Sequence, residues 1–286
     1  MWYIITLLSG FSFATADAFS KREAKNISTI VLAWVREVYA LPFLLPILFI
    51  IEIPELDKIF WIAMAICVAM DFVTTILYMK AITIAPLSLT IPYLGLTPIF
   101  ALIISMIILG ESATIMGFFG ILLISAGAYI LQIDRAKYGL FEPILSIFKN
   151  RGSLYMLMVS LAYAVTANVG KLAIQHSSPL FMCIIYFSLL GLAFSPFVLI
   201  KSRNDLTSLT KPLSGKIKIG LAMAVMAITH FTAISMMNVA YMISIKRLSM
   251  LFAIIYGWLF FKEKNIKERM TGAIIIIIGA ACIAFA

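Results

Sequence analysis

Apolar segments of about 20 residues follow one another along almost the whole chain, separated by short charged or turn-rich breaks. A membrane-spanning helix needs about 20 mostly apolar residues. The mean hydropathy of +1.07 and a charged fraction of 12% agree with a chain whose solvent is lipid. We therefore predict ten transmembrane helices and no soluble domain. The ten segments cover residues 2–20, 29–51, 59–79, 86–108, 115–133, 153–173, 180–200, 217–240, 243–261 and 268–286.

The second half of the sequence repeats the first at an offset of 152 residues. One ungapped register aligns a glutamate and two glycines: Glu111 with Glu263, Gly120 with Gly272, and Gly127 with Gly279. We divide the chain into a first repeat (1–133), a connecting loop (134–152) and a second repeat (153–286). Five helices is an odd number, so the second repeat must enter the membrane from the opposite side. The predicted fold is an all-α membrane protein with two inverted five-helix repeats, which is common among secondary transporters.

The two aligned glycines lie seven residues apart in the last predicted helix of each repeat. Small residues let membrane helices approach closely. We expect the helices 115–133 and 268–286 to pack together, or each against a second copy of the chain. A homodimer is therefore a further expectation.

The basic residues predict an orientation. Of the 22 Lys and Arg residues, 17 fall in loops on one side of the membrane, two on the other side and three within spans. Cytoplasmic loops carry the excess of positive charge, so both termini are predicted to face away from the cytoplasm. The basic residues form no continuous basic face, which argues against a nucleic-acid partner. Membrane lipids are the expected neighbours of these loop charges.

Six ionisable residues fall within predicted spans, where they are energetically expensive and usually face a cavity or a partner. They are Asp17, Arg36, Glu37, Asp71, Lys246 and Arg247. At a rise of about 1.5 Å per residue, Arg36 and Asp71 lie at similar depths below the cytoplasmic surface, so they could form an ion pair. Asp17 is interpreted as an interface charge near Lys21, with a ligand contact as the alternative, because Asp17 aligns with Asn168 at an offset of 151 residues.

We predict that a central cavity binds the substrate through Lys246, Arg247, His230, Asn168, Tyr93 and Tyr241. Lys246 and Arg247 would bind a negative group, because the aligned positions in the first half, Leu94 and Gly95, are uncharged. Asp71, Glu37 and Arg36 are assigned either to coupling with a proton or cation or to structural ion pairs. His230 has two interpretations, a proton relay or an ordinary hydrogen-bonded core residue.

Three prolines occur in the fourth predicted span: Pro86, Pro92 and Pro98. Each removes a backbone hydrogen bond and can kink a helix. Broken helices of this kind line the substrate path in transporters. We therefore expect this span to be broken.

Residues 85–89 (APLSL), 97–101 (TPIFA) and 109–111 (LGE) resemble the drug/metabolite transporter superfamily, in its EamA-type branch. The second-half copies, 248–252 and 261–263, lack the proline and the glycine. The resemblance implies export or exchange of metabolites, amino acids, nucleotide-linked compounds or drugs. It also implies cytoplasmic termini, opposite to the charge count, and both orientations stay open here.

The sequence therefore predicts a secondary transporter, an exporter or exchanger of a small metabolite that is anionic or amino-acid-like, working by alternating access. The alternative is an integral membrane enzyme acting on a lipid or prenyl substrate, although the sequence contains none of the HExxH or DxxD motifs that such chemistry uses. No catalytic residue, metal or cofactor is expected. The expected location is the cell membrane of a bacterium or archaeon.

Overall fold

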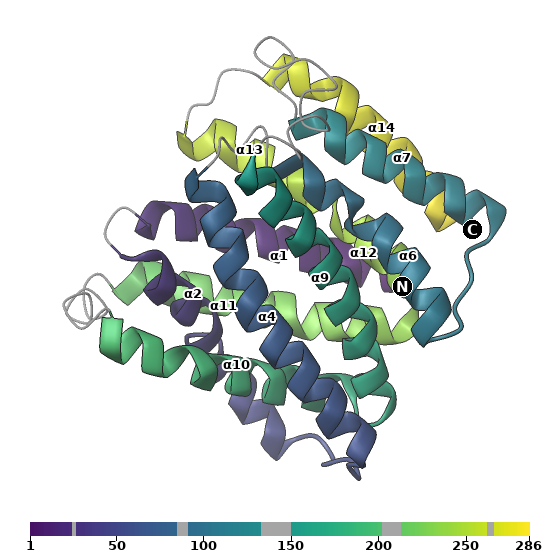
Figure 1. Ribbon diagram of the computed structural model, residues 1–286. Helices are drawn as coiled ribbons and strands as arrows, with labels where there is room; N and C mark the ends of the chain where they lie inside the picture. The colour runs from purple at the N-terminus through teal and green to yellow at the C-terminus, as the bar shows by residue number, and fades with distance from the viewer. Residues whose placement is uncertain (25–26, 85–90, 133–149, 202–212, 262–265) are drawn as a thin grey trace.

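The computed structural model describes residues 1–24, 27–84, 91–132, 150–201, 213–261 and 266–286, and all regular structure in these ranges is helical (Figure 1). A helix satisfies its backbone hydrogen bonds within one segment, as lipid requires. The first half contains α1 (Trp2–Glu23), α2 (Thr29–Val38), α3 (Leu41–Leu44), η1 (Leu45–Phe49), α4 (Lys58–Ile84), η2 (Ile91–Leu96), α6 (Thr97–Ile108) and α7 (Ile115–Gln132). The second contains α9 (Arg151–Gln175), α10 (Pro179–Lys201), α11 (Leu213–Met236), α12 (Val239–Lys246), α13 (Ser249–Phe261) and α14 (Ile266–Ala284).

Six of the described helical segments are long and apolar enough to cross a membrane. They are Ile30–Phe49, Lys58–Tyr78, Arg151–Gln175, Pro179–Ile200, Leu213–Met236 and Val239–Gly257. Three shorter apolar helices are Tyr93–Ile108, Ile115–Leu131 and Thr271–Ala284. All nine fall on predicted spans, whereas α1 belongs to neither group. The count of ten spans therefore stays a prediction.

The two halves pack against each other in a symmetric pattern. The most extensive contacts between halves join α1 to α11, α4 to α9 and α7 to α14. Exchanging the halves converts the first pair into the second, because α1 corresponds to α9 and α4 corresponds to α11. The third pair joins two helices that correspond to each other. The halves are thus related by a pseudo-two-fold arrangement.

Glycines form the contact between α7 and α14, which lie side by side in Figure 1. A Cβ at Gly127 would lie 2.9 Å from the carbonyl oxygen of Gly272, and a Cβ at Gly279 would lie 2.8 Å from that of Gly120. Gly120 thus meets Gly279 while Gly127 meets Gly272, so the two helices run antiparallel. The prediction that these helices pack together is confirmed, and their small faces are used within one chain.

Both halves interrupt the helix that precedes this glycine helix. In the first half the 3-10 helix η2 precedes α6. In the second half α12 ends at Lys246, and α13 begins at Ser249. The backbone there makes i→i−3 bonds, with Met250 N–H donating to the Arg247 carbonyl at 3.0 Å. Lys246 and Arg247 therefore lie at a break in their helix.

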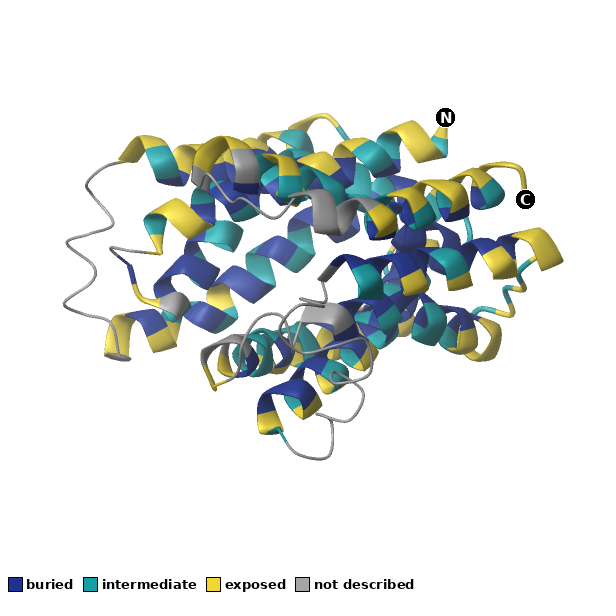
Figure 2. Ribbon diagram, turned by 90° about the horizontal axis from the view of Figure 1, so that it is seen from above, coloured by how far each residue is buried: buried dark blue, intermediate teal, exposed yellow. Residues whose placement is uncertain are grey.

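Large apolar side chains remain on the outside of the molecule. Ile107 is 77% exposed and Ile115 is 80% exposed. Figure 2 shows exposed residues along the outer faces of helices whose inner faces are buried. A protein in water rarely leaves so much apolar surface uncovered, whereas lipid tails cover it without cost.

Candidate functional site

A cavity of about 410 Å³ lies between the two halves. The first half contributes residues of α1, α2, α4, η2 and α6 to its wall, and the second contributes residues of α9, α10, α11, α12 and α13. Within the described ranges, α7 and α14 contribute no lining residue. The cavity is therefore built jointly by both repeats, while the glycine-packed pair stands outside it.

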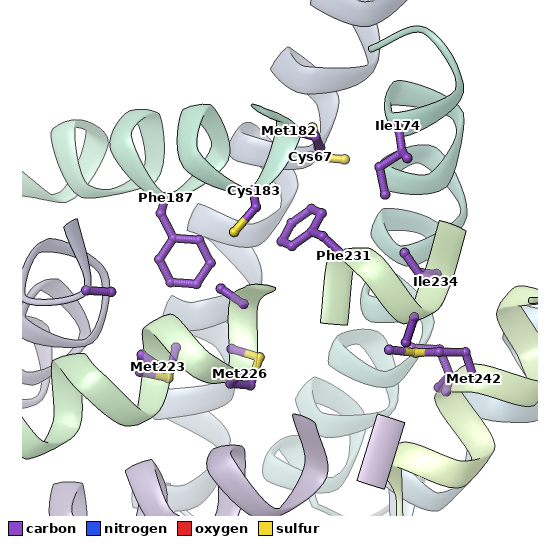
Figure 3. Close-up of a cluster of buried hydrophobic side chains, with 14 of the residues drawn as sticks. Cys67, Ile174, Met182, Cys183, Phe187, Met223, Met226, Phe231, Ile234 and Met242 are labelled. Atoms are coloured by element: carbon purple, nitrogen blue, oxygen red, sulfur yellow. The ribbon is translucent and has the colours of Figure 1, made fainter. Parts of the chain in front are cut away.

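One part of the cavity wall is apolar. Met182 and Phe187 come from α10, and Phe231 and Ile234 come from α11. In Figure 3, Phe187 and Phe231 extend from different helices into the same space. An apolar wall with a few convergent polar groups is the usual composition of a small-molecule site.

All six ionisable side chains that the sequence places within spans lie in the wall of this one cavity: Asp17, Arg36, Glu37, Asp71, Lys246 and Arg247. Three are acidic and three are basic, so their formal charges cancel. Grouping them around a cavity removes them from contact with lipid, where an ionised side chain is costly.

The guanidinium of Arg36 donates to the carboxylate of Asp17 in an ion pair. The ring of Phe13 lies 5.2 Å from the Arg36 Cζ atom. The predicted pairing of Arg36 with Asp71 is therefore wrong, because depth in the membrane does not determine the direction in which a helix turns its side chains. The placement of Asp17 as an interface charge beside Lys21 is corrected too, since Asp17 faces the cavity.

Asp71 of α4 binds two hydroxyl groups of the second half. The Tyr186 hydroxyl donates to Oδ2 at 2.5 Å, and the Thr166 hydroxyl donates to Oδ1 at 3.1 Å. Both oxygens of this carboxyl group thus have partners from α9 and α10. Among the described residues, Asp71 makes its side-chain hydrogen bonds with hydroxyl groups and forms no ion pair.

Lys246 has partners on two other helices. Its Nζ lies 3.1 Å from Nδ1 of His230 and 3.6 Å from Sδ of Met226. The Phe13 ring centroid is 5.3 Å from the same nitrogen. A charged ammonium donates to the unprotonated ring nitrogen, which leaves the His230 proton on Nε2.

Arg247 and Glu37 are different from the other four. Arg247 Nε and Glu37 Oε2 are buried, and neither atom has a hydrogen-bond partner within the described part of the chain. Tyr78 and Tyr163 are close enough to interact electrostatically with the Arg247 guanidinium. Both side chains are partly exposed as a whole, and within the described cavity wall these are the two buried side-chain atoms without a hydrogen-bond partner. A buried polar atom without a partner is unfavourable, so a ligand that bonds to either atom would be stabilised.

Asn168 lies in α9 but not in the cavity wall. Its side-chain nitrogen donates to the carbonyls of Ala101, at 3.2 Å, and Ala164, at 2.8 Å. Thr166, which faces the cavity, precedes it by two residues, or about 200° around the helix. Asn168 therefore faces α6, and its predicted place in the cavity is corrected.

Tyr241 and Tyr93 are also absent from the cavity wall. The Tyr241 hydroxyl accepts from the Thr114 backbone N–H at 2.8 Å, which fixes the start of α7 against α12. Tyr93 is buried in a separate apolar cluster with Leu131 and Met250. Both rings contribute to packing between helices.

The prolines mark the break in the fourth span rather than a kink within one helix. Pro92 falls in η2, and Pro98 occupies the first turn of α6, where its missing N–H is no loss. Pro86 lies outside the described residues. The second half breaks its corresponding helix at residues 246–249 without any proline.

Sequence reasoning missed a polar network at the other end of α12. Glu111 forms an ion pair with Lys171 of α9. Its Oε2 accepts from Ser105 Oγ at 2.5 Å and from the Val239 backbone N–H at 2.9 Å. Lys171 Nζ also donates to the Met237 carbonyl at 2.7 Å. The signal was the LGE triplet at residues 109–111, which marks the family resemblance but assigns the glutamate no partner.

A second polar pair joins the start of α4 to the end of α9, outside the spans. Asp57 Oδ2 lies 2.7 Å from Nδ1 of His176, and Asp57 Oδ1 accepts from the Phe60 backbone N–H at 2.9 Å. The Phe60 N–H, and after it the His176 ring, lower the pKa of Asp57 below its ordinary value. Asp57 thus caps α4 as a carboxylate.

Comparisons with known proteins were made for the family, for curated relatives and for the fold. The EamA-like transporter family matches twice, at residues 1–133 and 150–285. None of the curated proteins matches. Among solved structures 29 chains match, and one crystal structure of a protein aligns with a TM-score of 0.66 at 13% identity, covering 98% of this chain and 94% of the other. That likeness shows the fold alone. The two family matches cover nearly the whole sequence, and this chain belongs to the EamA-like transporter family.

Proposed function

We propose that the chain is a secondary transporter that moves a small metabolite with at least one negative group across the membrane by alternating access. Membership of the family makes it a multi-pass membrane transporter of small molecules. We assign it to export or exchange, in the cell membrane of a bacterium or archaeon. The comparisons give no support to the alternative of a lipid-modifying enzyme.

The architecture that we propose is ten spans in two inverted five-helix repeats. Support comes from the antiparallel course of the corresponding helices α7 and α14. The exchange of the α1–α11 and α4–α9 pairs supports it as well. In such transporters the site lies where the repeats meet, and one repeat rocks against the other around it.

The environment of Arg247 is the observation that supports a negative group on the substrate. It lies at the break between α12 and α13, lines the cavity, and has a buried Nε without a partner in the described chain. Lys246, the preceding residue, adds a second cation whose nearest partner is the imidazole of His230. A guanidinium binds carboxylate and phosphate groups in a bidentate geometry, so an anionic ligand supplies what this position lacks.

The test is transport by purified protein in proteoliposomes loaded with an isotope-labelled metabolite extract, with release followed by mass spectrometry. We expect Arg247→Gln and Lys246→Gln to abolish release of the transported anion and to leave the yield of folded protein unchanged. Lys218→Gln serves as the control, because this lysine lies outside the cavity wall and is exposed. Release at the wild-type rate by both cavity variants would contradict the proposal.

We also propose that the chain forms a homodimer in the membrane. The glycine faces of α7 and α14 are occupied by each other, so a second copy must use other surfaces. The mass of the protein in lipid nanodiscs, measured by light scattering, tests this. A mass corresponding to one chain per disc at every protein-to-lipid ratio would exclude a dimer.

A further inference from the structure

One ion pair binds the ends of two consecutive helices. The turn at residues 237–238 separates α11 from α12, and it leaves carbonyl groups free at the end of α11 and N–H groups free at the start of α12. Lys171 Nζ donates to the Met237 carbonyl at 2.7 Å, and Glu111 Oε2 accepts from the Val239 N–H at 2.9 Å. An ammonium at a helix C-terminus and a carboxylate at a helix N-terminus each match the sign of the helix dipole. We call the Glu111–Lys171 pair the socket of this turn.

Two more hydrogen bonds hold the start of α12 against the connection between α6 and α7. Asn238 Nδ2 donates to the Ser112 carbonyl at 3.3 Å, and the Tyr241 hydroxyl accepts from the Thr114 N–H at 2.8 Å. α12 lies beside α6 in Figure 1. Ser112 is exposed and Asn238 is partly exposed, so these bonds lie at the end of the molecule, where water can replace them.

α12 has an irregular backbone at both of its ends. Residues 237–238 are not helical, and beyond Lys246 the backbone makes i→i−3 bonds until α13 begins. The eight residues of α12 form a rod of about 12 Å. A few residues at the end of an element can absorb the backbone rotation of a hinge. The rod therefore has a hinge region with Lys246 and Arg247 at one end and the turn on its socket at the other.

The same turn joins two parts of the cavity wall. Ile234 precedes the turn by about one helical turn, and Ile243 follows it in α12. Both residues line the cavity and are only 2% and 7% exposed. The chain thus leaves the cavity wall at Ile234, forms the turn and returns to the wall at Ile243. Movement of the turn away from the socket would move both of these residues.

The lysine of the socket is not required by the packing of the repeat. Lys171 aligns with Ser20 at the offset of 151 residues, so the corresponding position in the first half is uncharged. The side chains of Lys171 and Glu111 are 9% and 17% exposed. Removing two charges from water is unfavourable, so an ion pair at this position needs partners that use both of its charges. The two helix ends at the turn are such partners.

We propose that α12 is a gate, which is closed in this structure by the turn 237–238 on its socket and which opens the cavity on that side when the turn is released. The inference rests on the proposed function, because alternating access requires an opening on each side of the membrane. The socket stays intact in both states, since Glu111 follows α6, and α6 packs against the α9 helix that carries Lys171. Only the bonds to the turn and to the start of α12 are exchanged for bonds to water. An anion bound at Arg247 would act on the same rod and thereby on the gate.

The first test measures access to the cavity through the gate. Ala167, which lines the cavity, is replaced by cysteine in a protein whose three native cysteines are replaced by alanine. An impermeant thiol reagent is added to intact cells or to inside-out vesicles, whichever preparation labels the exposed variant Ser112→Cys. The labelling rate of Ala167→Cys then reports how often the cavity opens on the side of the gate.

Tyr241→Phe removes one bond of the docked gate, so it should increase the labelling rate of Ala167→Cys about fivefold. Tyr256→Phe is the matched control. It removes a hydroxyl that bonds to Thr15 at 2.7 Å, between α13 and α1, and should leave the rate unchanged. Equal rates with and without Tyr241→Phe would contradict the gate. So would an equal increase in the control, because general loosening of the helices would then explain the labelling.

The second test fixes the gate in its closed position. Ser112→Cys and Asn238→Cys are introduced together in the same cysteine-free background and joined by a short bifunctional thiol reagent. The crosslinked protein should lose transport in proteoliposomes. Asp57→Cys with His176→Cys is the matched control, because it joins α4 to α9 at the same end, and these two helices pack extensively without the gate. Its crosslinked form should transport at the rate of its uncrosslinked form.

The outcomes separate the gate from the proposed function. Transport by the crosslinked 112–238 pair at the rate of its uncrosslinked form would overturn the gate and leave the transporter assignment intact. Failure of this pair to crosslink would contradict the docked contact itself. If the cysteine-free protein transports no anion, the proposed function fails, and the labelling rates of Ala167→Cys still decide whether α12 is a gate.

Discussion

Replacing Gly127 by alanine adds a Cβ that meets the backbone of α14. The new atom would lie 2.8 Å from the Ile276 nitrogen and 2.9 Å from the Gly272 oxygen. This is roughly half an ångström inside ordinary contact, so α7 and α14 must separate. Overpacking of this kind costs about 1–3 kcal/mol. Thermal unfolding of the purified protein should then shift down by roughly 2–10 °C.

Two further substitutions make this prediction strict. Gly279→Ala should cost as much as Gly127→Ala, because its Cβ meets Gly120 and Ile124, the symmetry-related partners, at 2.8 and 2.9 Å. Gly170→Ala is the control, since its Cβ would meet only the Cys67 Sγ at 4.0 Å, and should leave the melting temperature unchanged or higher. The reasoning is refuted if Gly127→Ala has the same melting temperature as Gly170→Ala. It is also refuted if only one of Gly127→Ala and Gly279→Ala is destabilised.

Three other outcomes follow from the described contacts and from the charge count. Glu111→Gln should destabilise the protein by about 3–5 kcal/mol, since Lys171 is then a buried cation without its carboxylate; an unchanged melting temperature would contradict this. Asp57 has a lowered pKa, so its contribution to stability is present above about pH 3.8, the ordinary value, and is lost as the pH falls through the lower folded-state pKa. Asp57→Asn should therefore make the melting temperature fall less steeply with decreasing pH below about pH 3.8. An unchanged dependence on pH would show that the Asp57 carboxylate does not stabilise the start of α4. A single cysteine in the loop 201–216 should resist an impermeant thiol reagent in intact cells, because the basic side is cytoplasmic, whereas labelling would reverse the orientation.

The repeat could be predicted from the sequence because glycine and glutamate matches within apolar segments are informative. Gly127 and Gly279 coincide in one register, and the structure gives them equivalent contacts. The location of the in-span charged residues at a cavity could be predicted for a different reason, because an ionised side chain in contact with lipid is energetically unfavourable. Composition and periodicity therefore predicted most of the fold.

Partners within the site could not be predicted in this way. Asn168 and Thr166 have nearly the same depth, but opposite faces of α9 direct one to α6 and the other to Asp71. The rotation of a helix depends on the shape of its neighbours, which no single segment encodes. The Glu111–Lys171 pair was missed for a related reason, because 60 residues and several helices separate its members.

The contact between α7 and α14 is the same surface used twice. Gly127 meets Gly272 as Gly279 meets Gly120, so each helix presents to its partner the face that its partner presents to it. A surface that is complementary to its own copy is the defining property of an isologous interface. A chain of half this length that inserted in both directions would bring together the same four glycines as an antiparallel dimer. Fusing two such halves then requires only a connection between them. After fusion, each half can acquire its own charged residues in the cavity wall. Lys246 and Arg247 illustrate this, because the aligned residues of η2 are uncharged.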